Sequence, residues 1–199
     1  MKRFKSVTIV KQPKALVWKA MRDRLPETVP FLDNVAAITQ VRRDEPMDGS
    51  VQLINLWKAD VKIPGAIQSI VDPSNLSWLD RAEWFEASDK CQWRIEPQFF
   101  TDHIRCTGST HFEPALGGQG TRITFEGELE ITVSNIAGLP TFMQAPVSKA
   151  MESLVTSLIP KNFRKITDAL SLLLEQKRDS KRTRRQAWTA QRCAGRNDD

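Results

Sequence analysis

Residues 147–176 read VSKAMESLVTSLIPKNFRKITDALSLLLEQ and hold a helical period of apolar residues over a longer span than any other segment of the chain. The apolar residues recur mainly at steps of three and four, which places one broad apolar stripe along a helix. At 1.5 Å per residue this helix would be about 45 Å long. Pro160 lies inside it and predicts a kink or a shorter lead-in helix, because proline removes one backbone donor. So long a stripe needs a large apolar surface to cover it.

The chain before this helix contains segments that alternate polar and apolar residues, as half-buried strands do. The clearest alternation runs over 121–133, and 102–113 alternates as well. The glycines of 117–120 predict a hairpin loop between these two strands. Gly127, at an inward position, predicts a bend or a close approach by another element. Further strands are expected at 4–11, 35–43, 51–60, 77–87 and 91–97, and short helices at 13–25 and 28–34.

This order of elements predicts an α+β fold. We expect a curved antiparallel sheet of about seven strands, wrapped around the long C-terminal helix, with two short helices after the first strand. A chain of 199 residues is long enough for one domain with a substantial core. We place that domain at 1–176 and expect a basic, disordered tail at 177–199.

The composition indicates a cytoplasmic protein. No apolar run approaches the roughly eighteen residues of a membrane span, and no apolar stretch follows the basic N-terminus as it would in a signal peptide. The cysteines, Cys91, Cys106 and Cys193, are odd in number and lack metal-binding or CxxC spacing. They are typical of structural thiols in a reducing compartment.

The net charge of +5 belongs to the tail, because 177–199 holds eight basic and three acidic residues while 1–176 holds 21 of each. A neutral body does not favour nucleic acid as a partner. The tail is either a solvated disordered segment or a segment that docks on anionic lipid, at about 1 kcal/mol per basic residue. In the second case the peripheral membrane contacts would come from Lys181, Arg182, Arg184, Arg185 and Trp188.

Two connections are more apolar than loops usually are. For 134–146 we expect short helical pieces that cap the core. For 61–73 two interpretations stay open, a gate over an internal site and plain packing against the core. The gate residues would be Ile63, Pro64, Gly65, Ile67 and Ile70.

Aromatic and aliphatic residues at the inward positions form one apolar surface, which suits a small-molecule pocket. The alternative is a solid core, since protein interiors are normally filled, and the residues alone favour it. The candidate ligand-binding residues are Trp57, Trp84, Trp93, Phe112, Phe125, Leu129, Met151, Leu154, Val155 and Leu158.

Little in the sequence indicates catalysis, and we expect no catalytic residue, cofactor or metal site. His103 and His111 share an outward parity and would lie about 27 Å apart along their strand, too far to share a metal ion. No catalytic or phosphate-binding motif is present. Four charged strand residues form either a buried pair that grips a ligand head group or external cross-strand pairs: Arg81, Glu83, Arg94 and Glu96.

Several local patterns resemble the START-like helix-grip superfamily, also called SRPBCC or the polyketide cyclase/dehydrase and lipid-transport superfamily. The first pattern is the run Pro13-Lys14-Ala15-Leu16-Val17-Trp18, which continues through Pro26 and Pro30 to Val35. The second is the order of Trp84, Trp93, Gly108, Phe112 and Gly120-Thr121-Arg122. The resemblance covers about 2–176 and is greatest to a bacterial branch of unknown function.

The resemblance implies a cavity between sheet and long helix that holds a hydrophobic small molecule or lipid, opened by a loop between early strands. Binding, with transfer as an option, is therefore the function we expect. Two alternatives stay open, a polyketide cyclase/dehydrase-like enzyme that uses polar residues in the same cavity and an interaction module without a ligand. The oligomeric state does not follow from the sequence.

Overall fold

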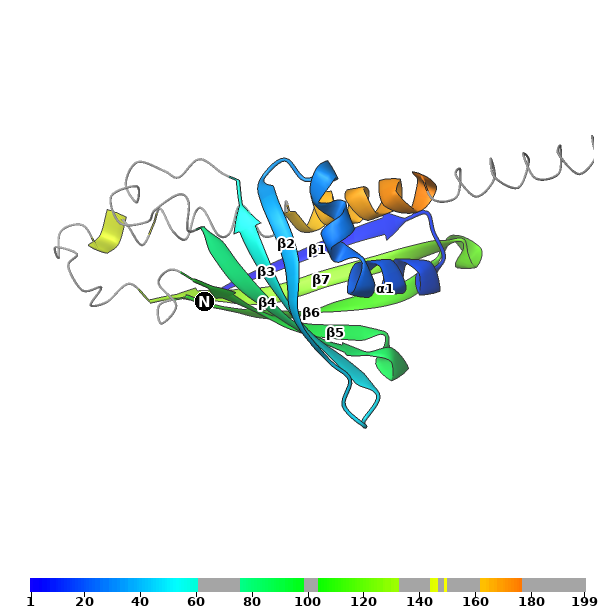
Figure 1. Cartoon of the computed structure of the whole chain (residues 1–199), viewed down its shortest axis with the longest axis horizontal. Helices are drawn as coiled ribbons and strands as arrows, with labels where there is room; N and C mark the ends of the chain where they lie inside the picture. Colours follow the sequence, from blue (N-terminus) through cyan, green and yellow to red (C-terminus); the bar gives the residue numbers. More distant parts are fainter. Residues whose placement is uncertain (61–75, 99–103, 133–143, 147–148, 150–161, 177–199) are drawn as a thin grey trace, which may run out of the picture.

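The computed structural model describes residues 1–60, 76–98, 104–132, 144–146, 149 and 162–176 (Figure 1). Residues 162–176 form a helix. The elements before it are β1 (Lys2–Val10), α1 (Lys14–Asp23), η1 (Leu25–Phe31), β2 (Val35–Asp44), β3 (Ser50–Ala59), β4 (Ser77–Phe85), η3 (Glu86–Ser88), β5 (Lys90–Pro97), β6 (Ile104–Ala115), η5 (Leu116–Gly118) and β7 (Gly120–Ile131).

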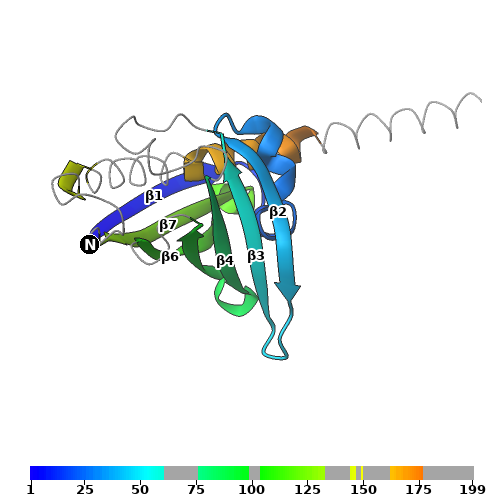
Figure 2. The same ribbon diagram turned by 60° about the vertical axis from the view of Figure 1, so that its left-hand side comes forward.

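The strands form one seven-stranded sheet in the order β1-β7-β6-β5-β4-β3-β2. All six pairings between neighbours are antiparallel. Strands β2 to β7 follow one another as a meander, and β1 returns to pair with β7. The sheet is strongly twisted and curved (Figure 2). The expected α+β architecture and the seven strands are confirmed.

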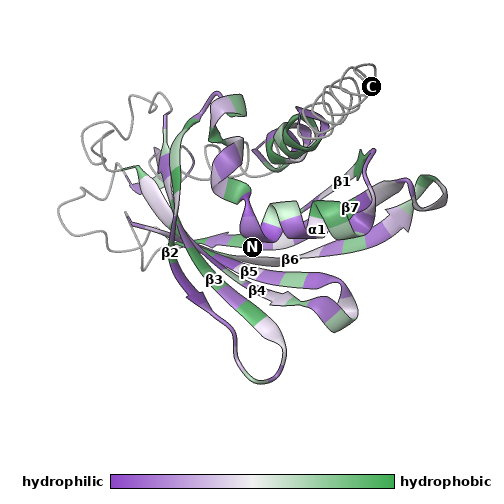
Figure 3. Cartoon of the chain, turned by 45° about the vertical axis from the view of Figure 1, so that its right-hand side comes forward, coloured by the Kyte–Doolittle hydropathy of each residue, from purple (hydrophilic) through white to green (hydrophobic). Residues whose placement is uncertain are grey.

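The sheet has a covered inner face and an open outer face. Apolar and polar residues alternate along the strands (Figure 3), so that buried Trp84, Trp93 and Phe112 all lie on the inner face. The helix α1, the short η1 and the helix at 162–176 cover this face (Figure 1). Removing the apolar residues from water on this side is the main favourable contribution to folding.

The described part of the C-terminal helix packs directly against the inner face. The ring of Phe163 stacks on that of Phe125 with centroids 4.2 Å apart, and Leu170 is fully buried in the same core. Asn34 donates a hydrogen bond to the side-chain oxygen of Asn162 over 2.6 Å. Most of 147–161, including Pro160, lies outside the described residues.

Two glycines face each other on neighbouring strands beneath the ring of Trp93. Gly108 on β6 pairs with Gly127 on β7. A Cβ on Gly127 would lie 2.6 Å from the Thr107 carbonyl oxygen and 2.6 Å from the Trp93 ring. A Cβ on Gly108 would overlap the same ring and the Glu126 carbonyl oxygen. The close approach that the sequence predicted at Gly127 is therefore confirmed, and Trp93 can lie flat on the strands only because both side chains are missing.

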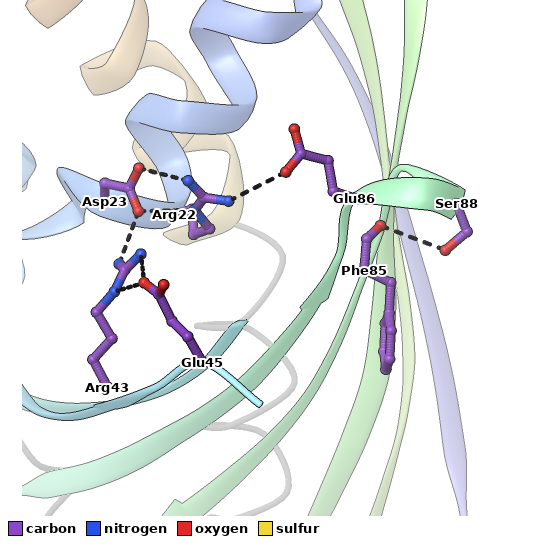
Figure 4. Close-up of polar contacts among 7 residues, drawn as sticks. All are labelled: Arg22, Asp23, Arg43, Glu45, Phe85, Glu86 and Ser88. Atoms are coloured by element: carbon purple, nitrogen blue, oxygen red, sulfur yellow. Dashed lines mark hydrogen bonds and ion pairs between the residues drawn. The ribbon is translucent and has the colours of Figure 1, made fainter. Parts of the chain in front are cut away.

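A network of charged side chains fixes the C-terminal end of α1 to β2 (Figure 4). Arg22 donates to the Asp23 carboxylate through Nε at 2.8 Å and Nη2 at 3.0 Å. Arg43 on β2 donates to Asp23 Oδ1 at 3.0 Å and also pairs with Glu45. Burial raises the pKa of Asp23, but the hydrogen bonds from Arg22 and Arg43 outweigh it, so that the pKa lies below its usual value.

Replacing Asp23 with Asn should destabilise the fold by about 1 kcal/mol at neutral pH, since Arg22 and Arg43 both lose a charged acceptor. A lowered folded-state pKa stabilises the fold above the unfolded pKa, and this contribution disappears as the pH falls through the folded pKa. The difference in the free energy of unfolding between wild type and Asp23→Asn, measured by urea denaturation, should therefore become smaller at acidic pH. Asp44→Asn is the matched control, because Asp44 pairs with the exposed Arg42. Equal losses in both variants would contradict this role of the network.

Candidate functional site

One end of the inner face is packed solid. Trp18 of α1 meets the rings of Trp84 and Phe112 edge-on, each with centroids 5.0 Å apart. Ile123 and Val10 beside them are almost fully buried. The large apolar side chains at this end are buried against one another, so we do not place a ligand here.

The middle of the inner face is an aromatic layer. Trp93 stacks on Phe125 with centroids 4.7 Å apart, and Phe4 lies beside both rings at 6.1 Å and 5.7 Å. Phe163 of the C-terminal helix covers Phe125 from above. At this level sheet and helix touch, and the layer forms a wall rather than an opening.

The opposite end of the inner face is less completely covered. Five of its inward positions, Phe4, Trp78, Asp80, Ile95 and Ile131, are half-buried, beside fully buried ones such as Cys106 and Leu129. At the packed end the large inward rings of Trp84 and Phe112 are buried. At this end β3 leads into 61–75 and β4 begins, on the left of Figure 1. We take this end as the candidate site, because apolar side chains of the inner face stay partly accessible there.

Asp80 places a carboxyl group in these apolar surroundings. It pairs across the strands with Asn55 on β3 and Ile95 on β5, and it shares the inner side of β4 with Ala82 and Trp84. Burial raises its pKa to about 6, against the lowering effect of the Asn55 and Trp57 side chains. Removal from water disfavours the charged form of a carboxyl group. Asp80 therefore changes its charge between acid and neutral pH.

Asn55 and Trp57 are the immediate neighbours of this carboxyl group on β3. Asn55 is only 4% exposed. The indole N–H of Trp57 is near enough to lower the pKa of Asp80, yet it makes no full hydrogen bond with any described group. Trp57 stacks on Trp78 with ring centroids 5.6 Å apart. We call Asn55, Trp57, Trp78, Asp80 and Ile95 the Asp80 site.

The structure brings the described candidate ligand-binding residues to the inner face but divides them between two clusters. Trp57 belongs to a cluster with Leu25, Leu32, Val35, Ile38 and Ala169. The main cluster holds the other five, which are Trp84, Trp93, Phe112, Phe125 and Leu129. The remaining candidate positions lie outside the described residues, namely Met151, Leu154, Val155 and Leu158 of the helix, the gate residues of 61–73 and the tail residues of 177–199.

The outer face carries the charged strand residues. Arg81 pairs with Glu96 over 2.6 Å, and Arg94 also bonds Glu96, while Gln52 donates to Glu83 over 2.9 Å. Of the two interpretations, external cross-strand pairs are therefore confirmed for these residues. Arg81, Glu83 and Arg94 border a hollow of about 1160 Å³ on the outer face, whose lining mixes charged and apolar side chains. Charged side chains make up much of its lining, and some of them are paired, such as Lys5 with Glu126, so it suits an apolar ligand less well than the inner face does.

The two described cysteines are not activated for chemistry. Burial raises the pKa of the Cys106 thiol to about 12, and burial together with Asp80 raises that of Cys91 well above its usual value. Both thiols therefore stay protonated, and neither is a ready nucleophile. Within the described ranges no three metal-ligating side chains come together.

No helix in the described part of the chain combines the length and the apolar character that crossing a membrane requires.

Sequence reasoning missed Asp80 and Asn55. In β4 the set Trp78, Asp80, Ala82 and Trp84 mixes charge with apolar groups, and so does the alternate set, so the strand alone does not show which set faces inward. The signal that could have found Asp80 is its spacing from Trp84. Trp84 was expected to face inward, and a residue four positions earlier in a strand faces the same way.

Comparisons with solved structures find the same architecture in proteins of distant sequence. A protein from Thermus thermophilus is 20% identical, with a TM-score of 0.58, over 85% of this chain and 94% of that one. An aromatase/cyclase from a Streptomyces species is 13% identical, with a TM-score of 0.60, over 88% and 94%. Truncated norcoclaurine synthase from Thalictrum flavum is 13% identical, with a TM-score of 0.54, over 87% and 92%.

The sequence matches no known family profile and no curated protein. At these identities the solved structures establish the fold alone. The chain has the START-like helix-grip fold that the sequence resemblance implied.

Proposed function

We propose that the protein binds an apolar small molecule or lipid between the inner face of the sheet and its helices, at the Asp80 site. The observation that carries the proposal is the incomplete cover of this end, where Trp78 and Ile95 face inward and are still half-buried.

Three parts of this proposal rest on the sequence. Residues 61–73 would gate the site, because β3 leads into them at its open end. The tail at 177–199 would hold the protein at an anionic membrane surface. Transfer of the ligand would then require both, since a carrier must open where it meets the membrane.

Asp80 favours a second candidate, an enzyme of the cyclase/dehydrase type. An acid or base catalyst works best when its pKa lies near the operating pH, and burial brings the pKa of Asp80 to about 6. Two of the similar structures are named for catalysed reactions, an aromatase/cyclase and a synthase. In this chain Asp80 would move a proton of a bound substrate, with Asn55 orienting its carboxyl group.

Binding can be tested with N-phenyl-naphthylamine, an uncharged apolar probe that fluoresces when it leaves water. We expect a saturable rise with the wild-type protein. Ile95→Gln should lower the affinity for the probe by about tenfold, since a polar amide then lies in the apolar site. Ile54→Gln is the matched control, because Ile54 is an equally half-buried strand isoleucine that faces the outer side, opposite Arg81.

Two results would count against this proposal. The absence of any saturable signal from the wild-type protein would favour the interaction module without a ligand. An equal loss in Ile95→Gln and Ile54→Gln would show that the probe does not bind on the inner face. Far-ultraviolet circular dichroism of both variants would confirm that they are folded.

A further inference from the structure

The Asp80 carboxyl group faces inward without a cationic partner among the described residues. The charged groups of the neighbouring strands, such as Arg81 and Arg94, lie on the outer face and bond Glu96. Arg43 is inward on β2 but is held by Asp23 and Glu45. On β5 the titratable group that faces the same side is the Cys91 thiol, which stays protonated.

The described C-terminal helix does not supply the missing cation either. Its residues in the two apolar clusters are Phe163, Ile166, Ala169, Leu170 and Leu174. Its Lys165 pairs with Asp33 over 2.6 Å, away from the sheet interior, and Arg164 is exposed. An ionised carboxylate in apolar surroundings is costly unless it is paired.

We infer that the ligand of this site carries a basic amine, which binds as an ammonium group to the Asp80 carboxylate while its apolar body lies against the inner face. This inference rests on the proposed function and specifies its ligand class. The ammonium group would give Asp80 the charge-assisted hydrogen bond that the described residues lack. The rings of Trp57 and Trp78 border the same position, and tryptophan faces attract cations.

Other polar groups fit this site less well. A hydroxyl group would donate a hydrogen bond but would leave the charge of Asp80 unpaired. A carboxylate would face the like charge of Asp80, which is unfavourable at close range. Asn55 is a positioning residue here, because its buried amide holds the Asp80 carboxyl group in one orientation. The site should therefore rank ligands of equal apolar body as amine above alcohol above acid.

The experiment compares naphthylethylamine, naphthylethanol and naphthylacetate, which share one aromatic body and differ in the polar group. Titration calorimetry with the wild-type protein at about pH 7.5 should give the amine an affinity at least about tenfold above the acid. The affinity of the Asp80→Asn variant for the amine should be at least about tenfold lower than that of the wild type, while its affinity for the acid should be the same or higher. Glu83→Gln, on the outer side of the same strand, should leave the order unchanged.

A second arm uses pH as the variable. Between about pH 7.5 and pH 5 the alkylamine stays protonated, whereas Asp80 takes up a proton. The wild-type protein should therefore lose affinity for the amine as the pH falls, and Asp80→Asn should show no such dependence. A merely structural role of Asp80 would weaken all three probes alike and would not produce this pH dependence.

The outcomes separate the inference from the function on which it rests. Equal affinities of the three probes for the wild-type protein, or an unchanged preference in Asp80→Asn, would overturn the amine assignment and leave apolar binding standing. If none of the three probes binds the wild-type protein and N-phenyl-naphthylamine also fails, the proposed function itself is overturned.

Discussion

Replacing Gly108 with Ala should destabilise the protein by about 3 kcal/mol or more, at the upper end of what overpacking a core costs. The added methyl group would overlap both the carbonyl oxygen of Glu126 on β7 and the ring of Trp93. The carbonyl oxygen belongs to the strand that pairs with β6, so it cannot move without disturbing that pairing. Urea denaturation followed by tryptophan fluorescence measures the loss.

Gly118→Ala is the control that separates overlap from backbone strain. Gly118 has φ +86°, and nothing lies within 4 Å of an added Cβ. Its replacement should cost only about 1 kcal/mol, from the left-handed backbone. A similar loss in both variants would show that the notch beneath Trp93 is not tightly packed.

A double variant separates the two overlaps that a methyl group at Gly108 would make, one with the Trp93 ring and one with the Glu126 carbonyl oxygen. Shortening Trp93 to Leu removes the ring but leaves the Glu126 carbonyl oxygen in place. Combining Trp93→Leu with Gly108→Ala should therefore restore part of the loss, and the coupling between the two changes should exceed about 0.5 kcal/mol. Strict additivity would indicate that Trp93 does not occupy the space above Gly108.

The strands could be predicted from the sequence because alternation is a local property. In β7 the outward Arg122, Thr124 and Glu126 alternate with the inward Ile123 and Phe125, and burial follows the same order. The glycine at position 127 signalled a close approach, but its cause did not follow from the sequence. Trp93 lies far away in the chain, on a strand that is not even adjacent to β7, so the contact depends on the completed sheet.

The site could be predicted less well, for a related reason. Phe112 and Phe125 of the inner face were found because β6 and β7 show a clear alternation. The division of the inner face into a packed end and an open end could not be predicted from the sequence, because it depends on where α1 packs. Trp18 of that helix fills the space above Trp84 and Phe112, and no local pattern shows which part of a sheet a distant helix covers.

Asp80 affects both the stability of the fold and the proposed binding of a ligand. A carboxyl group whose pKa is raised by burial makes the folded state less stable wherever the group is ionised. Groups that reduce stability in this way are concentrated at functional sites, where binding requires them. The open end of the inner face, not the packed end, is where this chain places such a group.

Asp80→Asn should accordingly stabilise the protein at neutral pH, by up to about 3 kcal/mol for a pKa of about 6 against an ordinary value of 3.8. Between these two values the folded wild-type protein keeps a proton that the unfolded chain releases. Wild-type stability should therefore fall as the pH rises through this window. The uncharged amide of Asn has no such dependence and can still accept a hydrogen bond from Asn55.

Urea denaturation of wild type and Asp80→Asn across this range gives the test. The two curves should nearly coincide below the ordinary carboxyl pKa and separate as Asp80 ionises, with the variant the more stable. Glu83→Gln, whose side chain lies outside the core and bonds Gln52, should change stability by less than about 0.5 kcal/mol. A variant that is less stable than wild type at neutral pH would mean that Asp80 is already paired inside the protein, and the amine assignment would fall with it.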